Sequence, residues 1–373
     1  MDFDLRGTIR ARKPSDTLRI IEPYIKKAGI TRIANLTHLD CIGVPVYTCI
    51  RPGSKSLATS QGKGISDELA MCSAYMESIE HYFSENIKPD LIAPITEIAP
   101  EDRVDLDKLP AGGIIKENKE ALITRWSLCE SLLNQKSIYF PTEFFCFDLT
   151  EPHIENSIFK KTTTGLASGN NTLEATCHAI YECIERYMSY LFASMPYQEK
   201  IDRMLNLSTV EYPEAAYFIN RLAENHIDCV IFDLTQVFNV PTFHAIIADE
   251  NPFRKLGNYS GTGTHWDPGI AICRAITEAI QSRLTYIAGS RDDMFPKDYK
   301  LKWQPLKFTG TRSFKTTYEH TPSYQSHFSL EDQLNWLLKK LAEQNYHPYR
   351  HVHTSIKNDS IAVVKVMIPD LAL

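Results

Sequence analysis

The sequence predicts an α+β fold in which helices pack on a mostly antiparallel β-sheet. Two sets of segments that alternate along the chain indicate this class. Short stretches rich in β-branched and aromatic residues are typical of strands, and they cover residues 44–50, 228–234, 242–248 and 361–368. Longer stretches with the apolar repeat of amphipathic helices cover residues 66–85, 172–190, 270–286 and 329–344.

An internal sequence repeat is the third observation. The segment RLAENHIDCVIFDL (221–234) is similar to KLAEQNYHPYRHVH (340–353), and each copy is followed by another strand. Each copy therefore predicts a helix, a strand and a second strand, so we expect an α-β-β duplication. The helix of the second copy opens with Ser329-Leu330-Glu331-Asp332, which is close to a capping box.

No low-complexity tract or flexible linker divides the 373 residues. We therefore expect one domain over 1–373, with no separate leader-peptide-binding domain. Two stretches, 88–113 and 292–323, are rich in loop-forming residues. The second is basic and either faces an acidic peptide or is simply solvated; its cations are Lys297, Lys300, Lys302, Lys307, Arg312 and Lys315.

Composition narrows the function classes. The formal net charge is -6 and the pI is about 6.1, so general nucleic-acid binding is not expected. No stretch approaches the ~20 apolar residues that cross a bilayer, and the charged start, MDFDLRGTIRARKPSD, lacks the apolar region of a signal peptide. The nine cysteines include no CxxC pair, which fits reduced thiols in the cytoplasm.

Three of the predicted helices carry polar side chains at the same spacing, i, i+4 and i+7, which places each set on one narrow arc. Each helix also follows a glycine-containing segment that we read as a loop. Glu174 extends the second arc by one turn. The sets are Ser73, Glu77 and Glu80; His178, Glu182 and Glu185; and Arg274, Glu278 and Gln281.

A polar helix face is most often just solvated. These faces, however, lack the lysines that would normally dilute like charges, and the pattern occurs three times, so convergence on a cation is the competing interpretation. Oxygen ligands of this kind suit Mg²⁺, and Mg²⁺ implies a phosphate-bearing ligand. The chain has no P-loop motif and no GxGxxG fingerprint. A nucleotide would then be held by the helix N-termini and by Lys63, Arg186, Arg283 and Arg291, although Arg283 and Arg291 could equally be surface cations.

The same segments resemble the YcaO family. The similarity lies in residues 31–52, 62–82, 165–187 and 261–293, more weakly in 363–369, and extends over about 17–369. It implies a YcaO-type fold that binds ATP and Mg²⁺ and a homodimer. It places metal ligands at Glu77, Glu80, Asn170, Glu174 and Glu185.

The resemblance also implies ATP contacts. Nucleotide- or metal-shell positions match Ser73, Glu182 and Arg186, and we expect Glu77, Glu182 and Arg186 to be catalytic. Further polar positions of the family's motifs, which we assign to ATP, match Lys63, Gln281, Arg283 and Arg291.

The implied activity is O-phosphorylation of a peptide backbone amide by ATP. In this mechanism a nucleophile adds to the amide carbon, the resulting oxyanion takes the γ-phosphoryl group of ATP, and phosphate then leaves. A Cys, Ser or Thr side chain of the substrate as the nucleophile gives an azoline, whereas external sulfide gives a thioamide. The sequence departs from the family at His81, where arginine is common, at Thr164, where asparagine is common, and in ending PDLAL without a proline-rich tail. It is most similar to members associated with thioamide formation and a TfuA-like partner.

Three alternatives stay open beside this expectation. The first is an enzyme whose product is an azoline rather than a thioamide. The second is a non-catalytic nucleotide-binding scaffold of a peptide-modification complex, and the third is a carboxylate-metal hydrolase. We expect a peptide substrate and a TfuA-like or leader-binding partner, with neither nucleic acid nor membrane as a partner.

Overall fold

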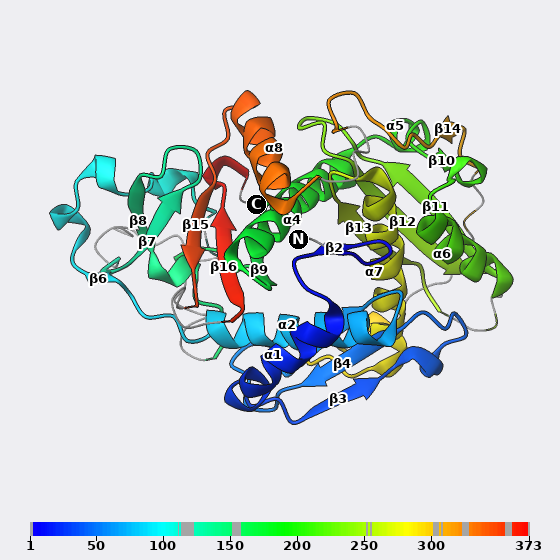
Figure 1. Cartoon of the computed structure of the whole chain (residues 1–373), viewed down its shortest axis with the longest axis horizontal. Helices are drawn as coiled ribbons and strands as arrows, with labels where there is room; N and C mark the ends of the chain where they lie inside the picture. Colours follow the sequence, from blue (N-terminus) through cyan, green and yellow to red (C-terminus); the bar gives the residue numbers. More distant parts are fainter. Residues whose placement is uncertain are drawn as a thin grey trace.

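Three antiparallel sheets, each covered by helices, surround the centre of the molecule in the computed structural model (Figure 1). The structure describes residues 3–110, 112, 123–150, 158–250, 253, 256–300, 306, 309–322, 328–354 and 360–371. Lys302, Lys307 and Leu373 lie outside these ranges.

The first sheet is made by a segment near the N-terminus. Its strand order is β3-β4-β5, and neighbours pair antiparallel. A helix precedes these strands and another follows them, and the two helices pack together. In chain order the elements are α1 (Pro14–Lys27), β3 (Arg32–Asn35), β4 (Val46–Ile50), β5 (Thr59–Lys63) and α2 (Asp67–Ser84).

The second sheet repeats this arrangement. Its order is β11-β12-β13, again antiparallel throughout, and the helix before the strands packs on the helix after them. The elements are α6 (Pro213–Glu224), β11 (Ile227–Asp233), β12 (Thr242–Asp249), β13 (Tyr259–Thr264) and α7 (Pro268–Ala288).

The third sheet has the same pattern in a different chain order. Strand β9 (Leu166–Gly169) and helix α4 (Thr172–Ser194) come first, and their partners arrive much later in the chain. Strand β16 pairs antiparallel with both β15 and β9, and α8 packs on α4. The late elements are α8 (Leu330–Glu343), β15 (Tyr349–Val352) and β16 (Ala362–Met367).

A side lobe extends the third sheet away from the centre, on the left of Figure 1. Strand β7 pairs with β15, β6 and β8, and a separate apolar cluster around Trp126 and Phe140 fills the lobe. The lobe strands are β6 (Leu91–Ile92), β7 (Arg125–Ser131) and β8 (Ser137–Pro141).

The remaining elements are short. Strands β1 (Phe3–Asp4) and β2 (Ile9–Arg10) form a two-stranded hairpin near the N-terminus. Helix α5 (Tyr197–Ile201) connects α4 to the second sheet. Strands β10 (Leu205–Asn206) and β14 (Arg312–Ser313) pair parallel.

The α+β prediction is confirmed, and all four predicted strands and all four predicted helices are present. The predicted duplication corresponds to α6-β11-β12 and α8-β15-β16, and α1-β3-β4 is a third copy that the sequence analysis did not find. Ser329 and Asp332 make the capping box at the start of α8.

One sequence-based interpretation is wrong. The glycine-containing segments before the three polar helices are not loops, because they form strands β5, β9 and β13. No helix among the residues that the structure describes is both long and apolar enough to cross a membrane.

Candidate active site

Close packing of a strand against the following helix sets the position of each polar helix. A Cβ atom added to Gly62 in β5 would lie 2.1 Å from the Ala74 nitrogen and 2.2 Å from the Ala70 oxygen of α2. Gly263 in β13 is equally close to α7, where an added Cβ would lie 2.2 Å from the Ala271 oxygen. Only glycine fits between these backbones. The direct contact of strand and helix fixes how each helix is placed, with its polar face toward the centre of the molecule.

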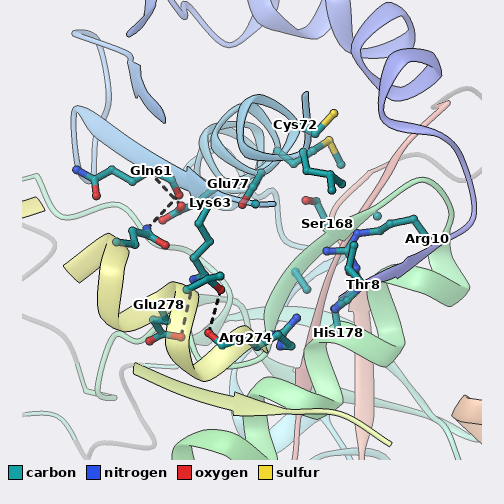
Figure 2. A pocket seen from close by; sticks show the side chains of 18 of the residues that line it. Thr8, Arg10, Gln61, Lys63, Cys72, Glu77, Ser168, His178, Arg274 and Glu278 are labelled. Carbon is teal, nitrogen blue, oxygen red and sulfur yellow. Dashed lines mark hydrogen bonds and ion pairs between the residues drawn. The ribbon is translucent and has the colours of Figure 1, made fainter. Parts of the chain in front are cut away.

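The three faces meet at one cavity of about 480 Å³. Figure 2 shows side chains of α2, α4 and α7 pointing into it from different sides. Each helix begins with a side-chain cap, from Ser66, Asn171 and Asp267 respectively, which fixes its first turn. The structure brings together these predicted site residues as lining: Lys63, Ser73, Glu77, Glu80, Asn170, Glu174, Glu182, Glu185, Arg186, Gln281 and Arg291.

Neighbouring strands orient the carboxylates that enter the cavity. Glu77 accepts a hydrogen bond from the backbone nitrogen of Gln61 at 3.2 Å. Glu80 accepts two from Ser168, at 2.8 Å from its backbone nitrogen and 2.6 Å from its hydroxyl. Glu185 accepts one from the backbone nitrogen of Thr264 at 3.1 Å. Each bond crosses from a helix to a different segment, so the carboxylates have fixed directions.

Asn170 and Glu174 form a second group at the start of α4. The Asn170 amide donates to both oxygens of Glu174, at 3.2 and 3.0 Å, and its own oxygen accepts from the Thr17 hydroxyl at 2.7 Å. The backbone nitrogen of Ala11 donates to Glu174 at 2.9 Å. The N-terminal segment therefore contributes to the site.

The carboxylates are held where their negative charge is costly. Burial raises the pKa of Glu77 to about 7, against the nearby charges of Lys63 and Arg291. Burial also raises the pKa of Glu80 to about 8. Burial, together with the charge of Glu278, raises the pKa of Glu185 to about 8. Desolvated carboxyl groups around one cavity are a place where a cation is strongly favoured.

Cations line the same cavity. Lys63 forms an ion pair with Glu278 at 3.8 Å, drawn as a dashed line in Figure 2. Arg186 lies 3.5 Å from Glu182. Arg291 pairs with Asp293 at 2.6 Å. Because the side chains of Lys63 and Arg186 are partly exposed, they can exchange these partners for a phosphate group.

Arg283 is the exception among the predicted ATP contacts. It does not line the cavity, and its guanidinium lies on the other side of α7, where it binds Asp40 at 2.7 and 3.0 Å and also Asp249. Its side chain is only 1% exposed. Position 283 of α7 lies on a different side of the helix from Arg274, Glu278 and Gln281. Arg283 therefore links Asp40, beside the first sheet, to Asp249 in the second sheet and does not face a ligand.

Several lining residues were missed as site residues by the sequence analysis. Arg10 and Thr17 come from the N-terminal segment, and only the folded chain brings them to the cavity. Arg274 and Glu278 also line it. Arg274 and Glu278 could have been predicted from the sequence, because they lie on the third polar arc. The Nε atom of Arg274 is buried without a hydrogen-bond partner among the described residues.

These side chains fit Mg²⁺ bound together with phosphate. Among the residues that the structure describes, no group of three or more His, Cys, Asp or Glu side chains encloses a metal position. Mg²⁺ commonly takes only one or two carboxylates and completes its shell with water and phosphate oxygens. The oriented, desolvated oxygens of Glu77, Glu80 and Glu185 meet that need, and Gln281 adds a buried oxygen without a partner in the described structure.

The departures from the family pattern lie close to the site. His81 also lines the cavity, and burial lowers its pKa to about 4, so the imidazole is neutral where the family commonly has a charged arginine. Its ring lies 6.0 Å from that of Phe147. Thr164 instead faces a small space behind β9, beside Cys183 and Leu371.

The comparison with protein families decides the identity. A family model described as YcaO cyclodehydratase, ATP- and Mg²⁺-binding, matches residues 61–372. The chain belongs to the YcaO family. ATP and Mg²⁺ are thus the cofactors of the family to which the chain belongs, and an ATP-dependent enzyme is the activity class that this membership supports.

Curated relatives agree with the assignment to YcaO. An uncharacterized Mycobacterium tuberculosis protein is 33% identical over 296 residues, which cover 77% of this chain and 64% of the relative. The chain therefore spans less than two thirds of that protein. A Rhizobium leguminosarum protein described as lying in the tfuA 3′ region is 32% identical and covered to 70%. An uncharacterized Methanothermobacter thermautotrophicus protein is 30% identical, with 97% of this chain and 94% of the relative covered.

Solved structures share the fold. A heterocyclase in complex with substrate and cofactor matches with a TM-score of 0.77 and 20% identity, over 96% of this chain and 52% of the other. YcaO from Methanopyrus kandleri, bound with AMPPCP and Mg²⁺, matches with a TM-score of 0.72 and 19% identity, over 99% and 94%. The predicted YcaO-type fold is therefore confirmed.

Proposed function

We propose that this YcaO protein uses ATP and Mg²⁺ to phosphorylate a backbone amide oxygen of a ribosomally made peptide or protein, giving a thioamide or an azoline. The observation that carries the proposal is the convergence of three polar helix faces on one cavity, with desolvated carboxylates and cations in the same lining. Such a set neutralises and positions phosphate groups, which is the main task of a phosphoryl-transfer enzyme.

Each part of the lining has a separate task in this proposal. Glu77 and Glu80 on α2 and Glu185 on α4 would hold Mg²⁺, with Asn170 and Glu174 extending the ligand set. When bound, ATP would supply the phosphoryl group that makes the amide oxygen a leaving group, and Mg²⁺ would screen the phosphate charge.

Three basic side chains would bind the phosphate oxygens of ATP directly. Arg186 and Lys63 would leave Glu182 and Glu278 for phosphate oxygens, and Arg291 would add a third positive charge. Ser73 and Gln281 offer a hydroxyl and an amide for hydrogen bonds. Burial raises the pKa of Glu182, so this carboxylate, once released by Arg186, accepts a proton more readily than an exposed one.

The experiment that tests the function is turnover of Mg·ATP by two isosteric variants. We expect Glu77→Gln and Glu185→Gln each to lower peptide-dependent ATP hydrolysis by about 100-fold or more, with unchanged circular dichroism. Glu343→Gln, on the outer end of α8, is the matched control because its partner Lys340 lies away from the cavity. Full activity in both site variants would overturn the site assignment.

The product distinguishes the two reactions. Mass spectrometry of the peptide gives the loss of water for an azoline and the exchange of oxygen for sulfur for a thioamide. The relative described as lying in the tfuA 3′ region supports a TfuA-like partner and thus the thioamide. The heterocyclase neighbours favour the azoline.

The second candidate is a non-catalytic nucleotide-binding scaffold. It is favoured by the neutral His81 at a position where the family commonly has arginine. ATP binding without any peptide-dependent hydrolysis, measured with peptide and partner present, would support the scaffold over the enzyme.

The assembly is also part of the proposal. We infer one catalytic domain over 1–373 that acts as a homodimer and receives its peptide through a partner protein. A chain of the E. coli microcin synthetase complex is a structural neighbour, with a TM-score of 0.64. That neighbour is part of an assembly of several proteins, which supports a partner protein here. All nine cysteines are free thiols, which supports a reducing, cytoplasmic location.

A further inference from the structure

The N-terminal segment crosses the cavity as a strap, which we define as residues 5–12. It lies between α2 and α4 in the centre of Figure 1, and its members Leu5, Arg6, Gly7, Thr8, Arg10 and Arg12 all line the cavity. The matching family model begins only at residue 61. The strap is therefore a feature of this chain that the family match does not cover.

The tip of the strap is a tight hairpin turn. Arg6 and Gly7 both have positive φ angles, 58° and 83°, and the nitrogen of Leu5 donates to the oxygen of Thr8 at 2.9 Å. Two such angles in succession are typical of a two-residue hairpin turn. The tip lies on α7, because a Cβ atom added to Gly7 would lie 3.5 Å from both Cβ and Sγ of Cys273.

The other end of the strap is held by α4. Glu174 accepts a hydrogen bond from the backbone nitrogen of Ala11 and lies 3.8 Å from the Nε atom of Arg10. The Arg10 guanidinium also contacts the ring of His178, and Figure 2 shows these two side chains together. The strap thus spans from α4 to α7, two of the helices that line the cavity.

Individual contacts to α4, α7 and Ser360 hold the strap in place, rather than pairing with a large sheet. Strands β1 and β2 pair only with each other, so the hairpin joins none of the three large sheets. An isolated two-stranded hairpin is marginally stable in water. The strap can therefore move away while the sheets and their helices stay intact.

We propose that the strap is a movable cover that must leave α7 before a nucleotide can leave the cavity, and that it closes again over the bound nucleotide. This inference rests on the proposed function, since the nucleotide is the expected occupant of the cavity. Arg10 and Ala11 contact Glu174, which is a proposed metal ligand. Binding of the metal at Glu174 would therefore change the contacts that hold the strap closed.

The distance at the tip allows the strap to be locked. Cβ atoms that are 3.5–4.5 Å apart suit a disulfide, and position 7 meets this condition with the native thiol of Cys273. In the variant Gly7→Cys, oxidation should join the strap to α7, and reduction should release it. The double variant Gly7→Cys/Cys273→Ser is the matched control, because it carries the same turn substitution and cannot form this bond.

The measurement is release of a fluorescent ATP analogue, preloaded with Mg²⁺ and chased with excess ATP in a stopped-flow instrument. We expect release from oxidised Gly7→Cys to be at least about tenfold slower than from the reduced protein, with no effect of oxidation on the double variant. Equal release rates in a protein whose disulfide is verified by mass would overturn the proposal. Position 7 has a positive φ of 83°, which strains any residue except glycine, so if the disulfide does not form, the cleavage measurement below decides the proposal.

A second measurement uses the unmodified protein and needs no turnover. Trypsin cleavage after Arg10 should slow by about tenfold when a non-hydrolysable ATP analogue and Mg²⁺ are added, whereas cleavage after the exposed Lys297 should not change. An unchanged rate after Arg10, in protein that binds the analogue, would refute the strap alone. Absence of any analogue binding would instead refute the proposed function.

Discussion

Substitution of Gly62 tests whether strand-to-helix packing positions the site. In Gly62→Ala the new methyl group would lie 2.1 Å from the Ala74 nitrogen and 2.2 Å from the Ala70 oxygen, both backbone atoms of α2. Ordinary contact needs about 3.4 Å, so α2 must move outward by about 1 Å. That movement carries Glu77 and Glu80 with it.

The size of the effect follows from this displacement. Overpacking of a close contact costs about 1–3 kcal/mol of unfolding free energy, and a shift of ~1 Å in positioning groups costs roughly 100-fold in rate. Gly53→Ala is the matched control, because nothing lies within 4 Å of its added Cβ and its φ is not positive. Urea unfolding and peptide-dependent ATP hydrolysis are the two assays.

The reasoning would be refuted by a Gly62→Ala protein that matches Gly53→Ala in both assays. A loss of activity without loss of stability would mean that the helix moves at little cost. A loss of stability with full activity would mean that α2 does not position the reacting groups.

The other predictions concern single buried charges. Burial raises the pKa of Glu185 from about 4.5 to about 8, so its ionisation costs stability once the pH exceeds about 4.5, and this cost grows until about pH 8. Without metal, Glu185→Gln should therefore have a free energy of unfolding up to about 3 kcal/mol higher than that of the native protein at pH 7. Urea titrations should show this difference disappear near pH 4.5. An equal difference at both pH values would contradict the prediction. Arg283→Met leaves Asp40 and Asp249 buried without their cation and should cost about 3–5 kcal/mol in unfolding free energy. If the variant unfolds at the same urea concentration as the native protein, the ion pairs are not part of what joins the sheets.

The sequence was sufficient for features that depend on local spacing. The i, i+4, i+7 arcs fix which side chains of one helix share a face, and every residue of these arcs lines the same cavity. The family resemblance added the positions outside the arcs, and together they place eleven of the twelve predicted site residues in the lining. Arg283 follows Gln281 by only two positions and thus points to another side of α7. Helical geometry alone could have excluded it.

Features that depend on distant pairing were not predictable in this way. Nothing in the short segment 5–12 indicates that Ala11 will meet Glu174, because that contact exists only once α1 and α4 are packed. Likewise, Gly62 and Gly263 were read as loop residues, since a strand interior disfavours glycine unless another backbone approaches it closely. The approaching helix is visible only in the fold.

The chain order of the third sheet has a consequence for synthesis in the cell. Strand β9, which leads directly into Asn170 and α4, pairs with β16, so Gly169 meets Ala362. At about 5–20 residues per second, a ribosome needs roughly 10–40 s to make the chain between them. Throughout that interval the wall that carries Glu174 and Glu185 has no completed sheet behind it. The nascent protein should therefore gain the ability to hold Mg·ATP only after β16 has been made and has paired with β9.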